Sequence, residues 1–196
     1  MATGFMIKSF AAAGIGAFVE TKYGPSLQPT GPAGLSPLFA ATPLVLIGVG
    51  FYTLTMGMEV GKARNKYMEL AKKDGEKEVE ERYGLPNLYA QGTSKHAKAF
   101  NAVQRAHQHI FETFTTVSIF GLAGALELPI CTAISTMIYA YGRRIFSNNY
   151  SQSEGDVGQR YSKNPHARLF WVGMLGNMVL GVISCVKILS KARLAE

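Results

Sequence analysis

Four apolar blocks separated by charged connections constrain this chain more strongly than any other feature. The blocks occupy about residues 38–60, 100–126, 128–146 and 169–189. A helix needs about 20 predominantly apolar residues to cross the hydrocarbon core of a bilayer. Because lipid offers no hydrogen-bond partner to the backbone, helices and closed barrels are the structures that can span it. The pattern therefore predicts an all-α integral membrane protein with a bundle of four transmembrane helices.

The residues before the first block form a separate segment. Residues 1–24 contain an apolar run that Lys8 interrupts, which is short for a membrane span. The run fits a weak targeting segment, an interfacial helix or a partial pass, and we favour the interfacial helix. The Pro- and Gly-rich stretch 24–37 predicts an irregular linker. We therefore expect an N-terminal extension over 1–37 and a membrane domain over 38–196.

The distribution of charge bears on partners and on orientation. The net charge of +7 could indicate nucleic-acid binding, but the basic residues are mixed with acidic ones at segment ends. No surface of interleaved aromatic and basic residues is predicted, so we exclude nucleic acid and favour a bilayer surface. Lys and Arg gather in the connections 61–100 and 143–168, whereas the turn at Glu127 has none. The positive-inside rule then places both connections in the cytoplasm.

Charged residues inside the second block point to a polar pocket. Arg105, His109 and Glu112 stand at i, i+4 and i+7, which is one face of a helix. An ionised side chain at the bilayer centre costs roughly 2.5–3.5 kcal/mol, so such groups face protein or water. We expect the following polar residues to face inward near the cytoplasmic surface: Arg64, Arg105, His107, His109, Glu112, Tyr139 and Arg143.

The residue types of this pocket favour an anionic ligand that also carries an amine. Guanidinium groups bind carboxylates bidentately, and an arginine or phenol beside a ligand thiol favours the thiolate. Two simpler interpretations remain open, because Arg143 could be a snorkelling anchor and Tyr139 an interfacial belt residue. His107 and His109 point to opposite sides of a helix and no carboxylate pairs with them, so we predict no metal site.

The string FNAVQRAHQHIFE, with KARNKY upstream and IYAYGRR downstream, resembles the MAPEG family of membrane glutathione-dependent proteins. The most similar motif is that of the microsomal glutathione S-transferase 3 branch. The resemblance implies a homotrimer of four-helix subunits in the bilayer. It also implies glutathione as the cosubstrate, bound between neighbouring subunits at the cytoplasmic side, and a hydrophobic, lipid-like second substrate.

The resemblance also implies a set of site residues. By matched position, the residues that contact glutathione are Arg64, Arg105, His107, Glu112 and Tyr139. In such enzymes an arginine near the loop after the third helix stabilises the thiolate, and Arg160 is the best match for this catalytic role. His109 replaces the usual asparagine and Arg143 stands where a ligand-binding tyrosine is common. We retain both as glutathione-binding residues, while the loop after Phe146 is longer than in relatives.

These implications predict a membrane-bound glutathione transferase or peroxidase that acts on hydrophobic electrophiles or lipid hydroperoxides. The endoplasmic reticulum is the expected membrane, with a mitochondrial or other organellar membrane as the alternative. A second function is a catalytically weak or inactive accessory subunit of a larger membrane complex. The altered ligand positions and the N-terminal extension motivate it. A non-catalytic binder of lipid mediators, or of the enzymes that make them, is a third possibility within the family.

Overall fold

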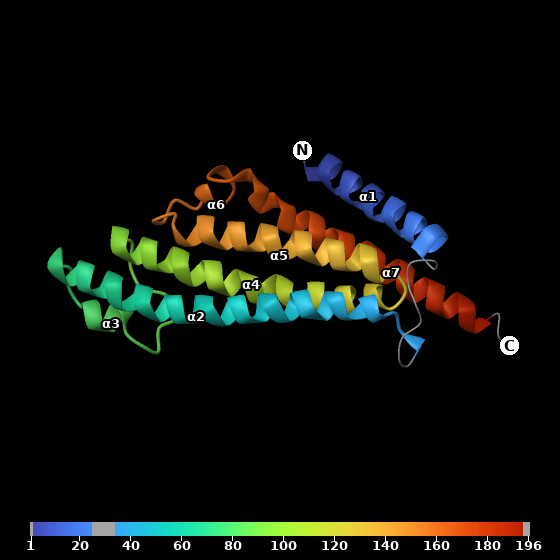
Figure 1. Cartoon of the computed structure of the whole chain (residues 1–196). Helices are drawn as coiled ribbons and strands as arrows, with labels where there is room; N and C mark the ends of the chain where they lie inside the picture. The colour runs from blue at the N-terminus through green and yellow to red at the C-terminus, as the bar shows by residue number, and fades with distance from the viewer. Residues whose placement is uncertain (1, 25–33, 194–196) are drawn as a thin grey trace. The chain divides into compact units, whose positions relative to one another are not determined.

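The computed structural model describes residues 2–24 and 34–193, and over these residues the fold is all-α, as predicted (Figure 1). The long helices are α1 (Ala2–Tyr23), α2 (Ala41–Lys73), α4 (Lys95–Ala125), α5 (Pro129–Ser151) and α7 (Leu169–Arg193). The short ones are η3 (Pro37–Ala40), α3 (Val79–Tyr83), α6 (Gln159–Ser162) and η4 (Pro165–Arg168).

The chain divides into two compact units, and three helices contribute residues to both. The first unit consists of Met1–Val49, Thr113–Gly142 and Leu169–Glu196. The second consists of Gly50–Glu112 and Arg143–Arg168. The units differ in their chemistry, so the packing of each is described separately.

The helices extend beyond all four predicted spans, and α7 does so only at its C-terminal end, which reaches Arg193. Helix α2 continues to Lys73, α4 already begins at Lys95, and α5 continues to Ser151. The connection predicted as a loop over 147–168 therefore contains the last turn of α5 as well as α6 and η4. The predicted linker falls mostly on residues 25–33, which lie outside the described part of the chain. A domain boundary after residue 37 stays a prediction.

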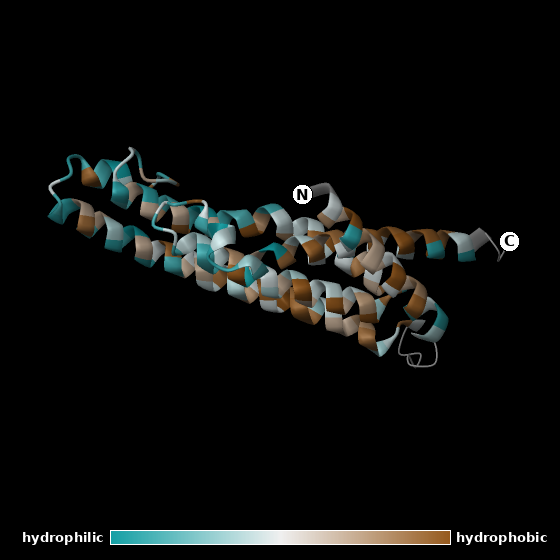
Figure 2. Ribbon diagram, turned by 90° about the horizontal axis from the view of Figure 1, so that it is seen from above, coloured by the Kyte–Doolittle hydropathy of each residue, from teal (hydrophilic) through white to brown (hydrophobic). Residues whose placement is uncertain are grey.

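Two segments of the described chain are long and apolar enough to cross a membrane, Pro37–Lys73 and Pro165–Lys191. Figure 2 shows hydrophobic residues along most of the C-terminal helix and hydrophilic residues around the connection between α2 and α4. The other two predicted spans, in α4 and α5, carry polar side chains such as Thr132 and Thr136, which are buried within the protein. These side chains lower the hydropathy of a helix without facing lipid. Crossing of the membrane by α4 and α5 stays a prediction.

In the first unit, α1 packs along α7 and caps α5 (Figure 1). Ala17 is buried with Leu128 and Leu180. The carboxylate of Glu20 accepts hydrogen bonds from the backbone N–H groups of Ile130 (2.9 Å) and Cys131 (2.8 Å). These are among the unpaired donors at the start of a helix, where negative charge is also favourable. The N-terminal helix is thus bound to the unit by a buried polar contact.

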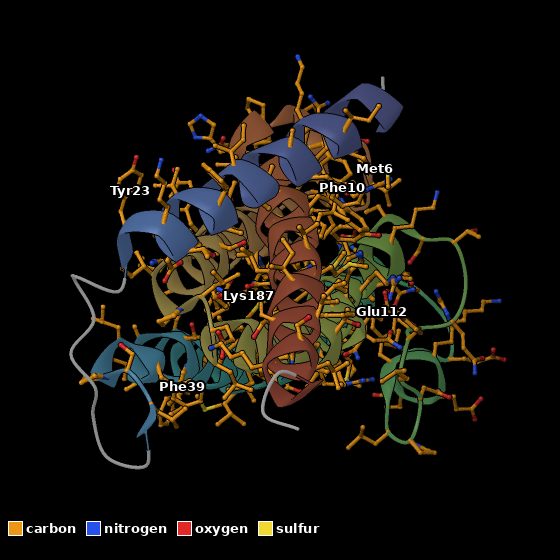
Figure 3. The ribbon with its side chains drawn as sticks, turned by 90° about the vertical axis from the view of Figure 1, so that its right-hand side faces the viewer. Met6, Phe10, Tyr23, Phe39, Glu112 and Lys187 are labelled. Atoms are coloured by element: carbon orange, nitrogen blue, oxygen red, sulfur yellow. The ribbon has the colours of Figure 1, made fainter. Side chains whose placement is uncertain are left out.

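A further polar contact lies near the same end of α1 as Glu20, and exposed apolar residues occur elsewhere on the helix. Figure 3 labels Met6 and Phe10 on this helix and Lys187 on α7. The ammonium group of Lys187 donates to the hydroxyl of Thr21 at 3.0 Å. Ile15 and Phe18 are exposed. The interfacial position expected for this helix stays a prediction.

Small residues allow α5 and α7 to approach closely within the first unit. The hydroxyl of Ser135 donates to the carbonyl of Gly173 at 2.9 Å, and a Cβ on Gly173 would collide with the backbone of Tyr139. The hydroxyl of Thr136 lies 3.3 Å from Asn177 Oδ1, and both residues are fully buried. Small residues and interhelical hydrogen bonds are the usual means of helix association where hydrophobic driving force is weak.

The second unit joins the end of α2, α3 and the start of α4 around an apolar cluster. Tyr83 and Phe100 are fully buried in it, together with Ala71 and Ala97. Figure 1 shows α3 beside the C-terminal part of α2. This cluster anchors the segment that follows α3, and that segment forms part of the cavity described next.

Candidate functional site

A cavity of about 370 Å³ lies in the second unit. Its lining residues come from α4, the segment before α4, the end of α5 and the loop after α5. They are Tyr89, Lys98, Asn101, Ala102, Arg105, Tyr150, Gly155 and Val157. The volume falls within the roughly 300–1,000 Å³ that is typical of small-molecule sites.

Two cations and two phenols give the cavity its polar character. Lys98 and Arg105 are seven residues apart on α4, so they share a face and are about 10 Å apart along the helix axis. Tyr89 and Tyr150 contribute hydroxyl groups, and no carboxylate lines the cavity among the described residues. This combination suits an anionic ligand with more than one acceptor group.

Arg105 makes a bidentate ion pair with Glu112. Nη2 of Arg105 is 3.1 Å from Oε2 of Glu112, and Nη1 bonds to Oε1 (Glu112 is labelled in Figure 3). The two side chains are 34% and 45% exposed, so solvent screens the pair and its contribution to stability is small. A ligand carboxylate can therefore exchange with Glu112 at little cost in folding free energy.

The segment before α4 is held against this helix by the side chain of Asn101. Its amide accepts from the backbone N–H of Ala90 at 2.8 Å and donates to the carbonyl of the same residue at 2.9 Å. The hydroxyl of Tyr89 donates to Oε1 of Gln108. These contacts with α4 fix Tyr89 at the cavity wall, although Tyr89 itself lies outside any helix.

The loop after α5 forms the other wall. Gly155 has a φ of +94°, a conformation that L side chains rarely adopt, and a Cβ there would lie 2.7 Å from Cβ of Lys98. Arg160 donates from Nη1 to the carbonyl of Val157 at 2.6 Å. Arg160 therefore supports the loop and does not itself line the cavity.

Arg143 and His109 form a buried pair outside the cavity lining. Nη1 of Arg143 is 2.7 Å from Nδ1 of His109, and the guanidinium carbon lies 4.6 Å from the ring centre of Phe146. A guanidinium can only donate, so Nδ1 of His109 is the acceptor. Because Arg143 is fully buried, the snorkelling interpretation does not describe it.

Arg64 binds backbone rather than lining the cavity. It donates to the carbonyl of Leu88 at 3.3 Å and to the carbonyl of Tyr83, and its guanidinium carbon lies 4.6 Å from the ring centre of Phe100. These contacts tie α2 to the segment between α3 and α4. The role of Arg64 in this structure is to position the wall that carries Tyr89.

The remaining two predicted residues have other neighbours. His107 is hydrogen-bonded to the backbone of Thr53 and packs edge-on against Phe111, with ring centres 5.1 Å apart. Tyr139 belongs to the first unit, is fully buried, and its hydroxyl lies 2.9 Å from that of Thr113. Of the eight residues predicted for the site, Arg105 lines the cavity and Glu112 contacts it through Arg105.

Sequence analysis missed most of the lining residues. Lys98 could have been found, because it stands seven residues before Arg105 and so lies on the same helix face. The sequence pattern could not have identified three other lining residues, namely Tyr89, Tyr150 and Val157. These residues reach the cavity only because the segments that carry them fold back against α4. Among the described residues no cluster of three or more His, Cys, Asp or Glu could hold a metal ion.

Comparison with known families decides the classification. The model of the MAPEG family matches residues 41–185. The chain belongs to the MAPEG family. MAPEG members are membrane glutathione-dependent transferases and peroxidases or enzymes of eicosanoid pathways, and they typically bind glutathione. Together with the apolar helices, this membership indicates an integral membrane protein and confirms the predicted family. A comparison with curated proteins finds no match.

Proposed function

We propose that this MAPEG protein is a membrane-bound glutathione transferase or peroxidase that acts on hydrophobic electrophiles or lipid hydroperoxides. The observation that carries the proposal is Arg105, which lines a cavity with a second cation and holds an exchangeable carboxylate, Glu112. Under this proposal the protein belongs to the microsomal glutathione S-transferase 3 branch, which the motif around Arg105 supports, and the endoplasmic reticulum is the proposed membrane.

Glutathione carries two carboxylates, one ammonium and one thiol, and these groups complement the cavity. A carboxylate of the ligand replaces Glu112 on the guanidinium of Arg105, because both are bidentate partners of the same geometry. Glu112 is then available to the ligand ammonium. The exchange pairs Arg105 with one ligand carboxylate and Glu112 with the ligand ammonium, so part of the desolvation cost of the ligand is compensated within the site.

The chemistry follows from the thiolate, which is the reactive form of glutathione. Tyr150 lines the cavity, and its phenol can donate to a sulfur anion, whereas the hydroxyl of Tyr89 already donates to Gln108. As a transferase, the thiolate attacks an electrophilic carbon and forms a thioether. As a peroxidase, two glutathione molecules reduce one hydroperoxide, giving a glutathione disulfide, an alcohol and water. Direct contact of Arg160 with the sulfur is the least supported of the predicted roles, since Arg160 bonds to the loop backbone.

We also propose that the active form is a homotrimer. Helix α2 presents exposed apolar side chains at alternating spacings of three and four residues, namely Leu44, Ile47, Phe51, Leu54 and Met58. Apolar residues at this spacing form the seam along which helices pack against one another in supercoiled bundles.

Turnover by the purified protein tests this function. In detergent with glutathione, wild-type protein is expected to conjugate 1-chloro-2,4-dinitrobenzene or to reduce a fatty-acid hydroperoxide. Arg105→Ala is expected to lose most of kcat/KM, whereas Lys62→Ala, an exposed change on α2, leaves it unchanged. No turnover and no heat of glutathione binding by the wild-type protein would refute the proposal.

A second candidate function is an accessory subunit of a larger membrane complex, and α1 favours it. This helix precedes the residues that match the family, yet Glu20 binds it firmly to the start of α5. Its exposed apolar residues Ile15 and Phe18 could contact another protein. Native electrophoresis of a mild-detergent extract distinguishes the two functions. A species of about three chain masses supports the enzyme, and stable migration with a large complex supports the subunit.

A further inference from the structure

Lys98 is an exposed residue that lines the cavity and lies close to Gly155. The loop after α5 approaches α4 at this residue, and a Cβ on Gly155 would lie 2.7 Å from Cβ and 3.3 Å from the carbonyl carbon of Lys98. Only glycine allows this approach, because the φ of +94° is also unfavourable for other residues. The contact limits the directions available to the Lys98 side chain, which lines the cavity.

The charge of Lys98 is not neutralised within the described part of the chain, where Lys98 forms no ion pair. Two acidic residues, Glu154 and Asp156, flank Gly155 in the sequence, and Asp156 is engaged within its own loop. Its carboxylate accepts from the backbone N–H of Gly158 at 3.0 Å and from Nε2 of Gln159 at 3.2 Å. Lys98 therefore offers a full positive charge to whatever occupies the cavity.

The positions of Lys98 and Arg105 on α4 suit a tripeptide with an acidic group at each end. Seven residues separate them, so their backbone positions are about 10 Å apart along the helix axis. Three extended residues span at most about 10–11 Å. One cation can therefore bind each terminal carboxylate of such a ligand, while the middle residue with its thiol lies between them beside Ala102, also in the lining.

We propose that Lys98 is a specificity-determining residue that binds the second carboxylate of glutathione, with Arg105 on the first, and that Gly155 sets its position. This inference rests on the proposed function, because it assumes glutathione as the ligand. It makes the cavity selective for a ligand with two carboxylates over an otherwise identical ligand with one.

Calorimetric titration of the purified full chain in detergent tests the proposal. The ligands are glutathione and its two monoethyl esters, each of which lacks one carboxylate charge. The variants are Lys98→Met, Lys98→Arg and the matched control Lys95→Met, which removes an exposed cation one turn earlier on α4, outside the cavity. Unfolding temperatures confirm that each variant is folded.

Lys98→Met is expected to raise Kd for glutathione about tenfold, as loss of a charge-assisted hydrogen bond does. Lys98→Arg, which keeps the charge, and Lys95→Met are expected to bind like the wild-type protein. One of the two monoesters should bind wild-type protein and Lys98→Met equally, which identifies the carboxylate that Lys98 contacts. Gly155→Ala should also raise Kd, although it removes no charge.

Two results would overturn the assignment of Lys98. The first is unchanged glutathione affinity in Lys98→Met. The second is an equal loss of affinity for glutathione and for both monoesters, which a general distortion of the cavity would produce. If the wild-type protein binds glutathione and Lys98→Met binds it equally well, this inference fails while the proposed function stands. If the wild-type protein binds no glutathione, both fail.

Discussion

The two units of this protein use polar side chains for opposite purposes. In the first unit, polar groups are buried and bound to one another or to helix backbone, as Glu20 is to α5 and Thr136 to Asn177. In the second, Lys98 and Arg105 line an open cavity, and the carboxylate that pairs with Arg105 is 45% exposed. Polar residues in the first unit join helices, whereas those around the cavity can still bind a ligand.

A similar contrast exists within the second unit, where position in a helix does not by itself reveal the role of a charged residue. Arg143 and Arg105 both come from helices and both were expected to bind glutathione. Arg143 is fully buried against His109 and Phe146, whereas Arg105 retains 34% exposure at the cavity. Exposure toward a cavity distinguishes the two, and it depends on which segments fold over each residue.

The largest effect is expected from Gly173→Ala in the first unit. The added Cβ would collide with the backbone of Tyr139, so α5 and α7 must separate, at a cost of about 3 kcal/mol. Thermal unfolding followed by the fluorescence of Trp171, the single tryptophan, measures the loss. Gly48→Ala is the matched control, because its Cβ meets nothing within 4 Å. Equal stability of the two variants would contradict close packing in this unit.

The next largest effect is expected on binding, from Arg105→Ala in the second unit. Loss of a bidentate charge-assisted contact should raise Kd for glutathione roughly tenfold to a hundredfold. Because the Arg105–Glu112 pair is exposed, the unfolding temperature should change little. Arg105→Lys keeps the positive charge but loses the planar guanidinium that binds a carboxylate through two N–H groups. This variant should therefore bind glutathione with intermediate affinity. A large loss of stability with unchanged affinity would assign Arg105 the joining role seen in the first unit.

A smaller effect on stability is expected from Glu20→Ala. This change leaves two backbone N–H groups of α5 without their acceptor, which typically costs about 1–2 kcal/mol for a helix cap. Glu20→Gln keeps one acceptor and should lose less. Glutathione affinity should be unchanged, since Glu20 belongs to the first unit. The unfolding temperature and calorimetric Kd of the two variants test both statements, and a change in Kd alone would contradict them.

The smallest effect is a pH dependence at the start of α4. A hydrogen bond from His96, then the charge of Lys95, lowers the pKa of Asp74 below its ordinary value of 3.8. A carboxyl whose pKa is lower in the folded state contributes stability that is fully present above its ordinary pKa and is lost as the pH falls through the lower, folded-state pKa. Asp74→Asn should therefore lower the unfolding temperature at pH 6 and lower it less near pH 3. An equal effect at both pH values would contradict this pairing.

Much of the fold could be predicted from the sequence because helical periodicity and apolar length are local properties. The start of α7 and the shared face of Arg105 and Glu112 followed from them. The cavity could not be predicted in the same way. Its walls depend on the contact of Asn101 with Ala90 and on the conformation of Gly155, which bring together segments distant in sequence. The same long-range packing placed Arg143 and Tyr139 away from the cavity lining.

An experimental structure of the protein with glutathione, determined by electron cryomicroscopy in detergent or nanodiscs, tests the central claim most directly. The account predicts ligand density in the cavity, with one carboxylate on the guanidinium of Arg105, the other toward Lys98, and Glu112 released from its present partner. An empty cavity at saturating glutathione, with the Arg105–Glu112 pair intact and the ligand bound elsewhere, would contradict it.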